Sequence, residues 1–167
     1  GLKCGSMFRV ESDLHGIHDQ LQDLELLLAP RGVSVSVLRF DGTGSLIYVY
    51  RPRKLEERLT QEGVPEFLAG YGYDMTSGIG MVSQLAERFA LCPTMPPEVG
   101  IFLDYPMEDV KGYIEHSGRC CRCIGCWKVY GDVEDAEKRF RSYKRCRDIY
   151  CRRFEEGCCI SRLAIRA

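Results

Sequence analysis

The sequence has no long apolar run and no export signal. None of its apolar stretches approaches the roughly 18 consecutive residues that a membrane-spanning helix needs. It also does not begin with a basic segment followed by an apolar segment and a small-residue cleavage site. These absences predict a cytoplasmic protein without a membrane span. The chain starts at Gly1 rather than at a methionine, so we expect its N-terminus to be truncated.

The common catalytic motifs are missing as well. The sequence contains no phosphate-binding loop, no G-x-S-x-G nucleophile elbow and no H-E-x-x-H zinc motif. The stretch "SGIG" at 77–80 offers two glycines, but no further glycine completes a dinucleotide-binding fingerprint. No catalytic residue is therefore assigned, and an enzyme with an unidentified site ranks behind the two hypotheses developed below.

Net charge is close to zero, but the charges are distributed unevenly. Residues 1–118 carry ten Lys and Arg against seventeen Asp and Glu, a net charge of −7. Residues 119–167 carry thirteen against seven, a net charge of +6. Such a basic region attracts anionic partners, but no aromatic-interleaved nucleic-acid motif accompanies it. A small molecule or a protein is therefore the expected partner, rather than a nucleic acid.

Apolar periodicity predicts both helices and strands. A helical stripe that begins at a cap, Ser12 or Asp13, ends near Pro30. Alternating valines over 33–40 predict a strand that pairs with 45–50 in a hairpin. The same reasoning predicts further helices over 52–63, 64–70, 75–91 and 106–118, and a long last helix capped by Asp132. Strands are expected over 98–104, 126–131 and 158–165.

This order of elements predicts an α/β fold, with α+β as the alternative. We expect a mixed sheet of four to five strands with an N-terminal β-hairpin, covered by helices. A chain of 167 residues suits a single globular domain over 1–167. The proline-rich stretch at 92–97 is the best candidate for an internal boundary.

Four of the ten cysteines lie within seven positions, next to the single tryptophan. The spacing C-x-x-C occurs twice there, as in many zinc sites, and neighbouring arginines would lower the thiol pKa. A complete zinc or iron–sulfur site needs more ligands, and no second separate C-x-x-C pair exists. No cofactor is therefore predicted, and a zinc, iron–sulfur or redox module is the alternative. Its candidate ligands are Cys120, Cys121, Cys123 and Cys126.

Aromatic side chains gather near the predicted element ends, where α/β sheets form ligand crevices. Lys128 and Tyr130 would share one face of their strand, because side chains alternate along a strand. The predicted ligand or partner surface comprises Asp104, Tyr105, Trp127, Lys128 and Tyr130.

Two segments, "EVGIFLDYPMEDVKGYIEHSG" and "GCWKVYGDVEDAEKRFRSYKRC", resemble the bacterial DUF3793 family of unknown function, found mainly in anaerobic Firmicutes. "GLKCGSMF" and "LIYVYRPRKLEERL" are similar to its N-terminal and middle segments, so the resemblance covers most of the chain. The positions that match the family pattern are Tyr105, Pro106, Asp109, Gly112, Trp127, Lys128, Tyr130 and Gly131.

The chain also departs from that pattern. The family usually has glycine where this chain has Asp104, histidine where it has Pro97, and an aromatic where it has Cys126. The resemblance does not include the cysteine cluster, and it implies a cytoplasmic protein of an anaerobic bacterium without naming an activity. We therefore expect an accessory protein that binds a ligand or a partner, with the thiolate metal or redox module as the alternative.

Overall fold

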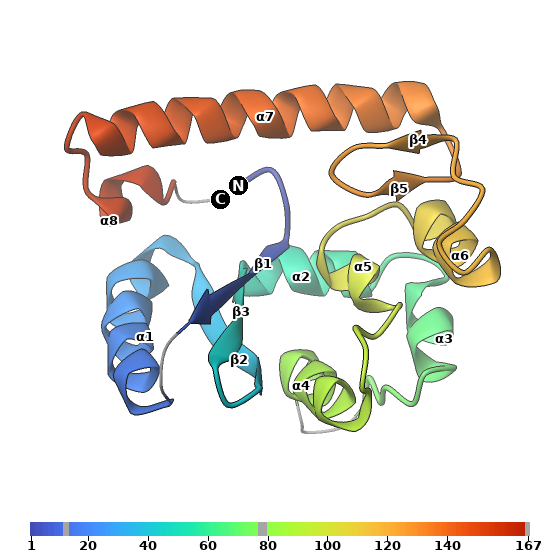
Figure 1. Cartoon of the computed structure of the whole chain (residues 1–167), viewed down its shortest axis with the longest axis horizontal. Helices are drawn as coiled ribbons and strands as arrows, with labels where there is room; N and C mark the ends of the chain where they lie inside the picture. The colour runs from blue at the N-terminus through green and yellow to red at the C-terminus, as the bar shows by residue number, and fades with distance from the viewer. Residues whose placement is uncertain (12–13, 77–79, 166–167) are drawn as a thin grey trace.

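The computed structural model describes residues 1–11, 14–76 and 80–165 (Figure 1). It is a mixed helix and strand fold, with 51% helix and 16% strand. The predicted helix cap at Ser12 or Asp13 and most of the 77–80 glycine motif lie outside the described residues.

The main sheet has three antiparallel strands in the order β1-β3-β2. The predicted hairpin is confirmed as β2 (Ser34–Phe40) and β3 (Gly44–Tyr50). β1 (Gly5–Glu11) pairs with the other edge of β3 along its whole length. β1 was not predicted, because "GSMFRVE" shows no clean alternation of apolar and polar residues.

The prediction of one sheet with four to five strands is wrong. The other two strands, β4 (Cys123–Ile124) and β5 (Lys128–Val129), form a small separate hairpin. The predicted strand at 98–104 is instead a short helix, α5 (Val99–Phe102). A buried apolar run of this length fits either element, so its sequence could not decide between them. The predicted strand at 158–165 likewise contains the short helix α8 (Ile160–Leu163).

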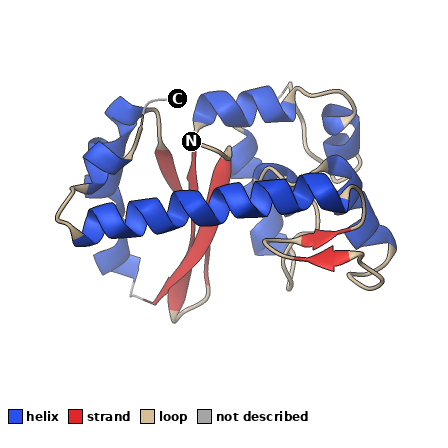
Figure 2. Cartoon of the chain, turned by 90° about the horizontal axis from the view of Figure 1, so that it is seen from above, coloured by secondary structure: helices blue, strands red, loops and turns tan. Residues whose placement is uncertain are grey.

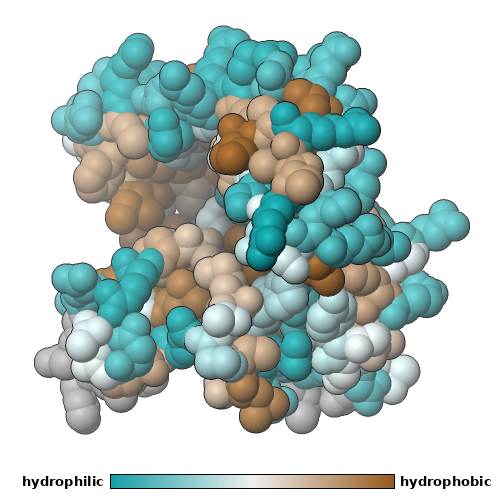
Figure 3. Space-filling view, turned by 45° about the vertical axis from the view of Figure 1, so that its right-hand side comes forward, coloured by the Kyte–Doolittle hydropathy of each residue, from teal (hydrophilic) through white to brown (hydrophobic). Residues whose placement is uncertain are grey.

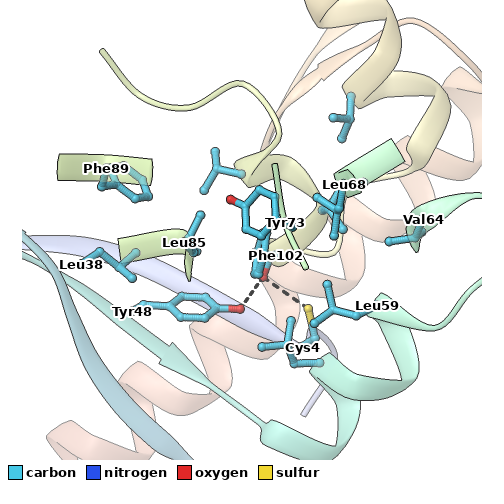
Figure 4. Packing of buried hydrophobic residues seen from close by; sticks show 14 residues of the cluster. Cys4, Leu38, Tyr48, Leu59, Val64, Leu68, Tyr73, Leu85, Phe89 and Phe102 are labelled. Carbon is cyan, nitrogen blue, oxygen red and sulfur yellow. Dashed lines mark hydrogen bonds between the residues drawn. The ribbon is translucent and has the colours of Figure 1, made fainter. Parts of the chain in front are cut away.

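The larger core lies between one face of the sheet and α2 (Pro52–Leu59), α3 (Val64–Ala69), α4 (Met81–Leu91) and α5 (Figure 4). It includes buried residues from both sides of the stretch at 92–97. The helix predicted from residue 75 begins only at Met81.

Two hydrogen bonds join the sheet to α5 in this core. The Cys4 thiol and the Tyr48 hydroxyl both donate to the carbonyl oxygen of Phe102, over 3.3 and 2.7 Å (Figure 4). Burial raises the pKa of the Cys4 thiol to about 12, because the interior disfavours its charged form. These contacts hold β3, and the residue directly before β1, against α5.

A smaller core lies on the other side of the sheet, under α1 (Leu14–Leu28) and a single 3-10 turn, η1 (Ala29–Arg31). Its buried side chains are Ile17, Leu28, Val33, Val35 and Ile47.

The remaining helices lie toward the second half of the chain. The predicted helix at 106–118 is confirmed as α6 (Met107–Glu115), and the long last helix as α7 (Val133–Glu155). Asp132 caps α7 as predicted, since its side chain accepts a hydrogen bond of 3.0 Å from the N–H of Asp135. α7 runs from the β4–β5 hairpin across the sheet to α8 (Figures 1 and 2). No helix in the described ranges is long and apolar enough to cross a membrane.

Candidate functional site

The predicted surface around Trp127 is built on a buried carboxylate. Asp109, in the first turn of α6, accepts a hydrogen bond of 2.6 Å from the indole Nε1 of Trp127. Its other oxygen accepts from the backbone N–H groups of Tyr130 and Gly131, at 2.6 and 2.8 Å. Three donors converge on one carboxylate, which therefore fixes α6 to the segment that leads into α7. We call this set of contacts the Asp109 junction.

Two glycines allow the close packing of the Asp109 junction. A Cβ atom at Gly112 would lie 2.5 Å from the Cβ of Tyr130, closer than real side chains approach. A Cβ atom at Gly131 would meet the carboxylate of Glu108, which itself accepts a hydrogen bond of 3.4 Å from the N–H of Asp132. Close packing and hydrogen bonding within the fold therefore explain why Glu108, Gly112 and Gly131 stand at these positions.

Tyr105 and Trp127 come together, as predicted residues of one surface. Their rings stack with centroids 4.9 Å apart, and the Tyr105 hydroxyl donates to the carbonyl oxygen of Cys126 over 3.4 Å. However, Trp127 is only 7% exposed. Its ring is therefore largely a packing element rather than an open contact surface.

The other predicted residues point to separate partners. The Lys128 ammonium donates to the carbonyl oxygen of Gly118 over 2.7 Å, while the Tyr130 ring stacks on His116. Asp104 lies 3.9 Å from the Nε of Arg58. Its backbone φ of 66° lies in the left-handed region, which glycine adopts without strain and aspartate rarely adopts.

The four clustered cysteines follow one another along the β4–β5 hairpin and the loop before it. Cys120 and Cys126 are exposed, while Cys121 and Cys123 are partly buried. Cys123 packs in the cluster around Trp127. Across the described residues, no group of three or more His, Cys, Asp or Glu side chains is arranged to hold a metal ion. The structure therefore adds no support to the zinc or iron–sulfur alternative.

A hollow lies elsewhere in the described structure, beneath α7. This groove has a volume of about 870 Å³ and is bounded by residues 1–6, the end of β3, the underside of α7 and α8. Figure 3 shows the hollow opening between two parts of the molecule, with apolar side chains on its walls. We call it the α7 groove. Its floor and roof come from opposite ends of the sequence.

One end of the α7 groove is an aromatic wall that continues from the Asp109 junction. The Phe140 ring meets Trp127 edge-on, with centroids 4.5 Å apart, and Tyr143 follows one helical turn later. The Lys3 ammonium lies 5.5 Å from the centroid of the Tyr143 ring. Burial raises the pKa of Tyr143 to about 12, so its hydroxyl is neutral and can donate a hydrogen bond at physiological pH.

A family model described as a protein of unknown function, DUF3793, matches residues 1–164. The chain belongs to the DUF3793 family. The resemblance found in the sequence is thereby confirmed over nearly its whole length. No curated protein and no solved structure matches this chain.

The charges around the α7 groove of this DUF3793 chain have one sign. Four basic residues line it, namely Lys3, Arg51, Lys144 and Arg147, and no Asp or Glu of the described residues does. Arg51 is the most enclosed of them, at 9% exposed. The groove of this DUF3793 protein is therefore an apolar space with a positive lining.

Part of this groove has a signal in the sequence. Tyr143, Cys146 and Tyr150 lie on one apolar stripe of α7, and all three line the groove. Such a stripe normally indicates a helix face buried in a core. Here all three residues are only partly buried. Arg51 was missed altogether, because nothing in its sequence neighbourhood distinguishes it from an exposed arginine.

Proposed function

We propose that this DUF3793 protein is a binding protein that holds a small, largely apolar molecule in the α7 groove. The observation that carries the proposal is the groove itself, an open space of about 870 Å³ with tyrosine, phenylalanine and aliphatic side chains in its walls. Ligand sites in proteins are typically hollows of about 300–1,000 Å³ with mostly apolar walls and a few polar groups. The α7 groove has that size and composition.

The roof of the groove supports the same proposal. Of the 23 residues of α7, only Ala136 is buried among those described, although the helix carries a regular apolar stripe. A helix usually buries such a stripe against a neighbouring element. Beneath Tyr143, Cys146 and Tyr150 lies the hollow instead, so these side chains are placed to contact a molecule that enters it.

The wider setting follows from the resemblance and the composition. The DUF3793 resemblance and cysteines that form no disulfide in the described structure together favour a cytoplasmic accessory role in an anaerobic bacterium. Binding, rather than catalysis, is proposed because the groove contains no carboxylate and no histidine among the described residues that could act as a general base.

A neutral fluorescent probe tests the proposal. N-phenyl-1-naphthylamine, which brightens in apolar surroundings, should bind the protein at about one molecule per chain. Cys146→Phe places a ring in the groove and should weaken this binding at least tenfold. Cys151→Phe makes the same change at an exposed position of the same helix and should leave binding unchanged. Equal binding by both variants, or no saturable binding by the unaltered protein, would rule out the groove as the site.

A further inference from the structure

Arg51 is the only cation among the buried charged side chains of the described structure. One NH1 hydrogen is donated to the carbonyl oxygen of Arg31 over 3.2 Å, and one NH2 hydrogen to that of Ile165 over 2.7 Å. The other N–H groups of this guanidinium form no hydrogen bond within the described part of the chain, although it has five donors in all. Arg51 is thus both enclosed and incompletely partnered.

The other two buried charges have charged or multiple polar partners within the described structure, although Glu98 Oε2 itself has no hydrogen-bond partner there. Glu98 forms an ion pair with Arg88, with 2.8 Å between Oε1 and Nε. Asp109 accepts three hydrogen bonds at the Asp109 junction. Buried charges are costly unless they are paired or well hydrogen-bonded. Within the described residues Arg51 forms no ion pair with a carboxylate, and its guanidinium binds only carbonyl oxygens, so a negatively charged group in the groove would complete its surroundings.

The rest of the groove lining reinforces this positive field. Lys3 and Lys144 form no ion pair in the described ranges, and Arg147 pairs only with Asp148, which is not part of the groove. Arg51 and Tyr150 both line the groove. Burial raises the pKa of the Tyr150 phenol, while the guanidinium of Arg51 opposes the rise.

We infer that the ligand of the α7 groove is a small amphipathic anion, whose carboxylate or phosphate binds Arg51 while its alkyl or aromatic body lies along the tyrosine wall. The inference rests on the proposed function, since it names the chemical class of molecule for the same groove. A guanidinium suits this role because its N–H groups form a fork that matches the oxygens of carboxylate and phosphate.

Three probes with the same ten-carbon chain test the inference: decanoate, decyl phosphate and decanol. Each is titrated to displace N-phenyl-1-naphthylamine from the protein. We expect at least one anion to displace the neutral probe at a concentration at least tenfold below that of decanol. The better of the two anions then shows whether the site prefers a carboxylate or a phosphate.

Substitution locates the anion. Arg51→Met should remove the advantage of the anions over decanol, and Arg51→Lys should keep part of it. Arg53→Met is the matched control, because Arg53 lies two residues away and is 86% exposed in its side chain. Arg53→Met should leave the displacement by all three probes unchanged. If Arg51→Met does not fold, Lys144→Met, which alters the groove lining, is compared with Arg145→Met on the same helix outside it. Only the former should weaken anion binding, by about two- to threefold.

The outcomes separate the inference from the proposed function. Displacement by decanol as readily as by both anions would overturn the inference and leave the groove as a site for neutral molecules. An anion preference that survives both Arg51→Met and Lys144→Met would overturn it too, because the charge would then be recognised elsewhere. Failure of the neutral probe to bind at all would instead remove the proposed function.

Discussion

The two ends of α7 are held in very different ways. At its start the helix is capped by Asp132, buries Ala136, and packs Phe140 against Trp127. From Tyr143 onward the same helix has no buried residue, and its inner face borders the α7 groove. One end is therefore part of a packed interior, and the other is a roof over an open space.

This contrast separates structural motifs from candidate functional ones. The most recognisable stretch of the sequence, from Trp127 to Asp132, belongs to the Asp109 junction, where the Trp127 indole and the N–H groups of Tyr130 and Gly131 already bind the carboxylate. The groove-lining residues are chemically ordinary in sequence and have unused surface in the structure. In this protein, the distinctive motif fixes α6 to the segment that leads into α7, while the less distinctive half of α7 indicates where a ligand would bind.

The strongest test of the contrast is to remove the carboxylate at the Asp109 junction. Asp109→Ala leaves one buried and two partly buried donors without an acceptor and should lower the free energy of unfolding by about 3 kcal/mol or more. Urea unfolding followed by the fluorescence of the single tryptophan measures this directly. Asp148→Ala, at an exposed position on the other half of α7, should cost less than about 0.5 kcal/mol. Equal losses for the two variants would contradict the contrast.

Adding a single methyl group at the Asp109 junction should also lower the free energy of unfolding. Gly112→Ala places a Cβ atom 2.5 Å from that of Tyr130, and the resulting shift should cost about 1–3 kcal/mol, although alanine favours helix more than glycine does. Gly80→Ala is the control, since no atom lies within 4 Å of its added Cβ. The same urea titration should show it unchanged or slightly stabilised. A stable Gly112→Ala would mean that α6 and the Tyr130 segment are loosely held.

Burial of the Cys4 thiol in the core beside the groove should make the free energy of unfolding depend on pH in alkaline solution. The Cys4 thiol has a pKa of about 12 in the folded chain and an ordinary value of 9.0, so between these pH values it ionises only when the protein unfolds. Unfolding then releases a proton, and stability falls as the pH rises above 9, by about 1.4 kcal/mol per pH unit at most. Cys4→Ser should show a shallower fall between pH 9 and 10. Identical slopes for the two proteins would mean that solvent reaches the thiol.

A larger side chain in the groove should leave the free energy of unfolding almost unchanged. Cys146→Phe enters an open space of about 870 Å³, so the free energy of unfolding should change by less than about 0.5 kcal/mol. Val129→Phe adds a ring at a fully buried position of the cluster around Trp127 and should cost about 1–3 kcal/mol. A large loss for Cys146→Phe would show that the underside of α7 is packed after all.

The sequence predicted local structure better than tertiary arrangement. Asp132 capped its helix and the valine strand paired in its hairpin, because both signals act between near neighbours. The segment 98–104 was mistaken for a strand, since its apolar residues are buried in either form and only distant contacts select the helix. The same limit applies to the site. Arg51 is enclosed by carbonyl groups 20 and 114 residues away, at Arg31 and Ile165, and no local pattern could indicate such a meeting.

The smallest expected effect concerns the cysteine cluster that first attracts attention in the sequence. If the β4–β5 hairpin is held by the Asp109 junction and not by a metal, a chelator should change the free energy of unfolding, measured by urea titration, by less than about 0.5 kcal/mol. Replacing Cys120 and Cys126, the two exposed thiols, with serine should be equally mild. Protein purified without oxygen and measured by elemental mass spectrometry provides the control. Near-stoichiometric zinc or iron, lost in the double variant, would mean that the hairpin binds a metal and would move the search for function from the groove to the thiols. Trace metal in both proteins would leave the α7 groove as the better-supported site, because the Asp109 junction and the packing around Trp127 would then hold the hairpin without a metal.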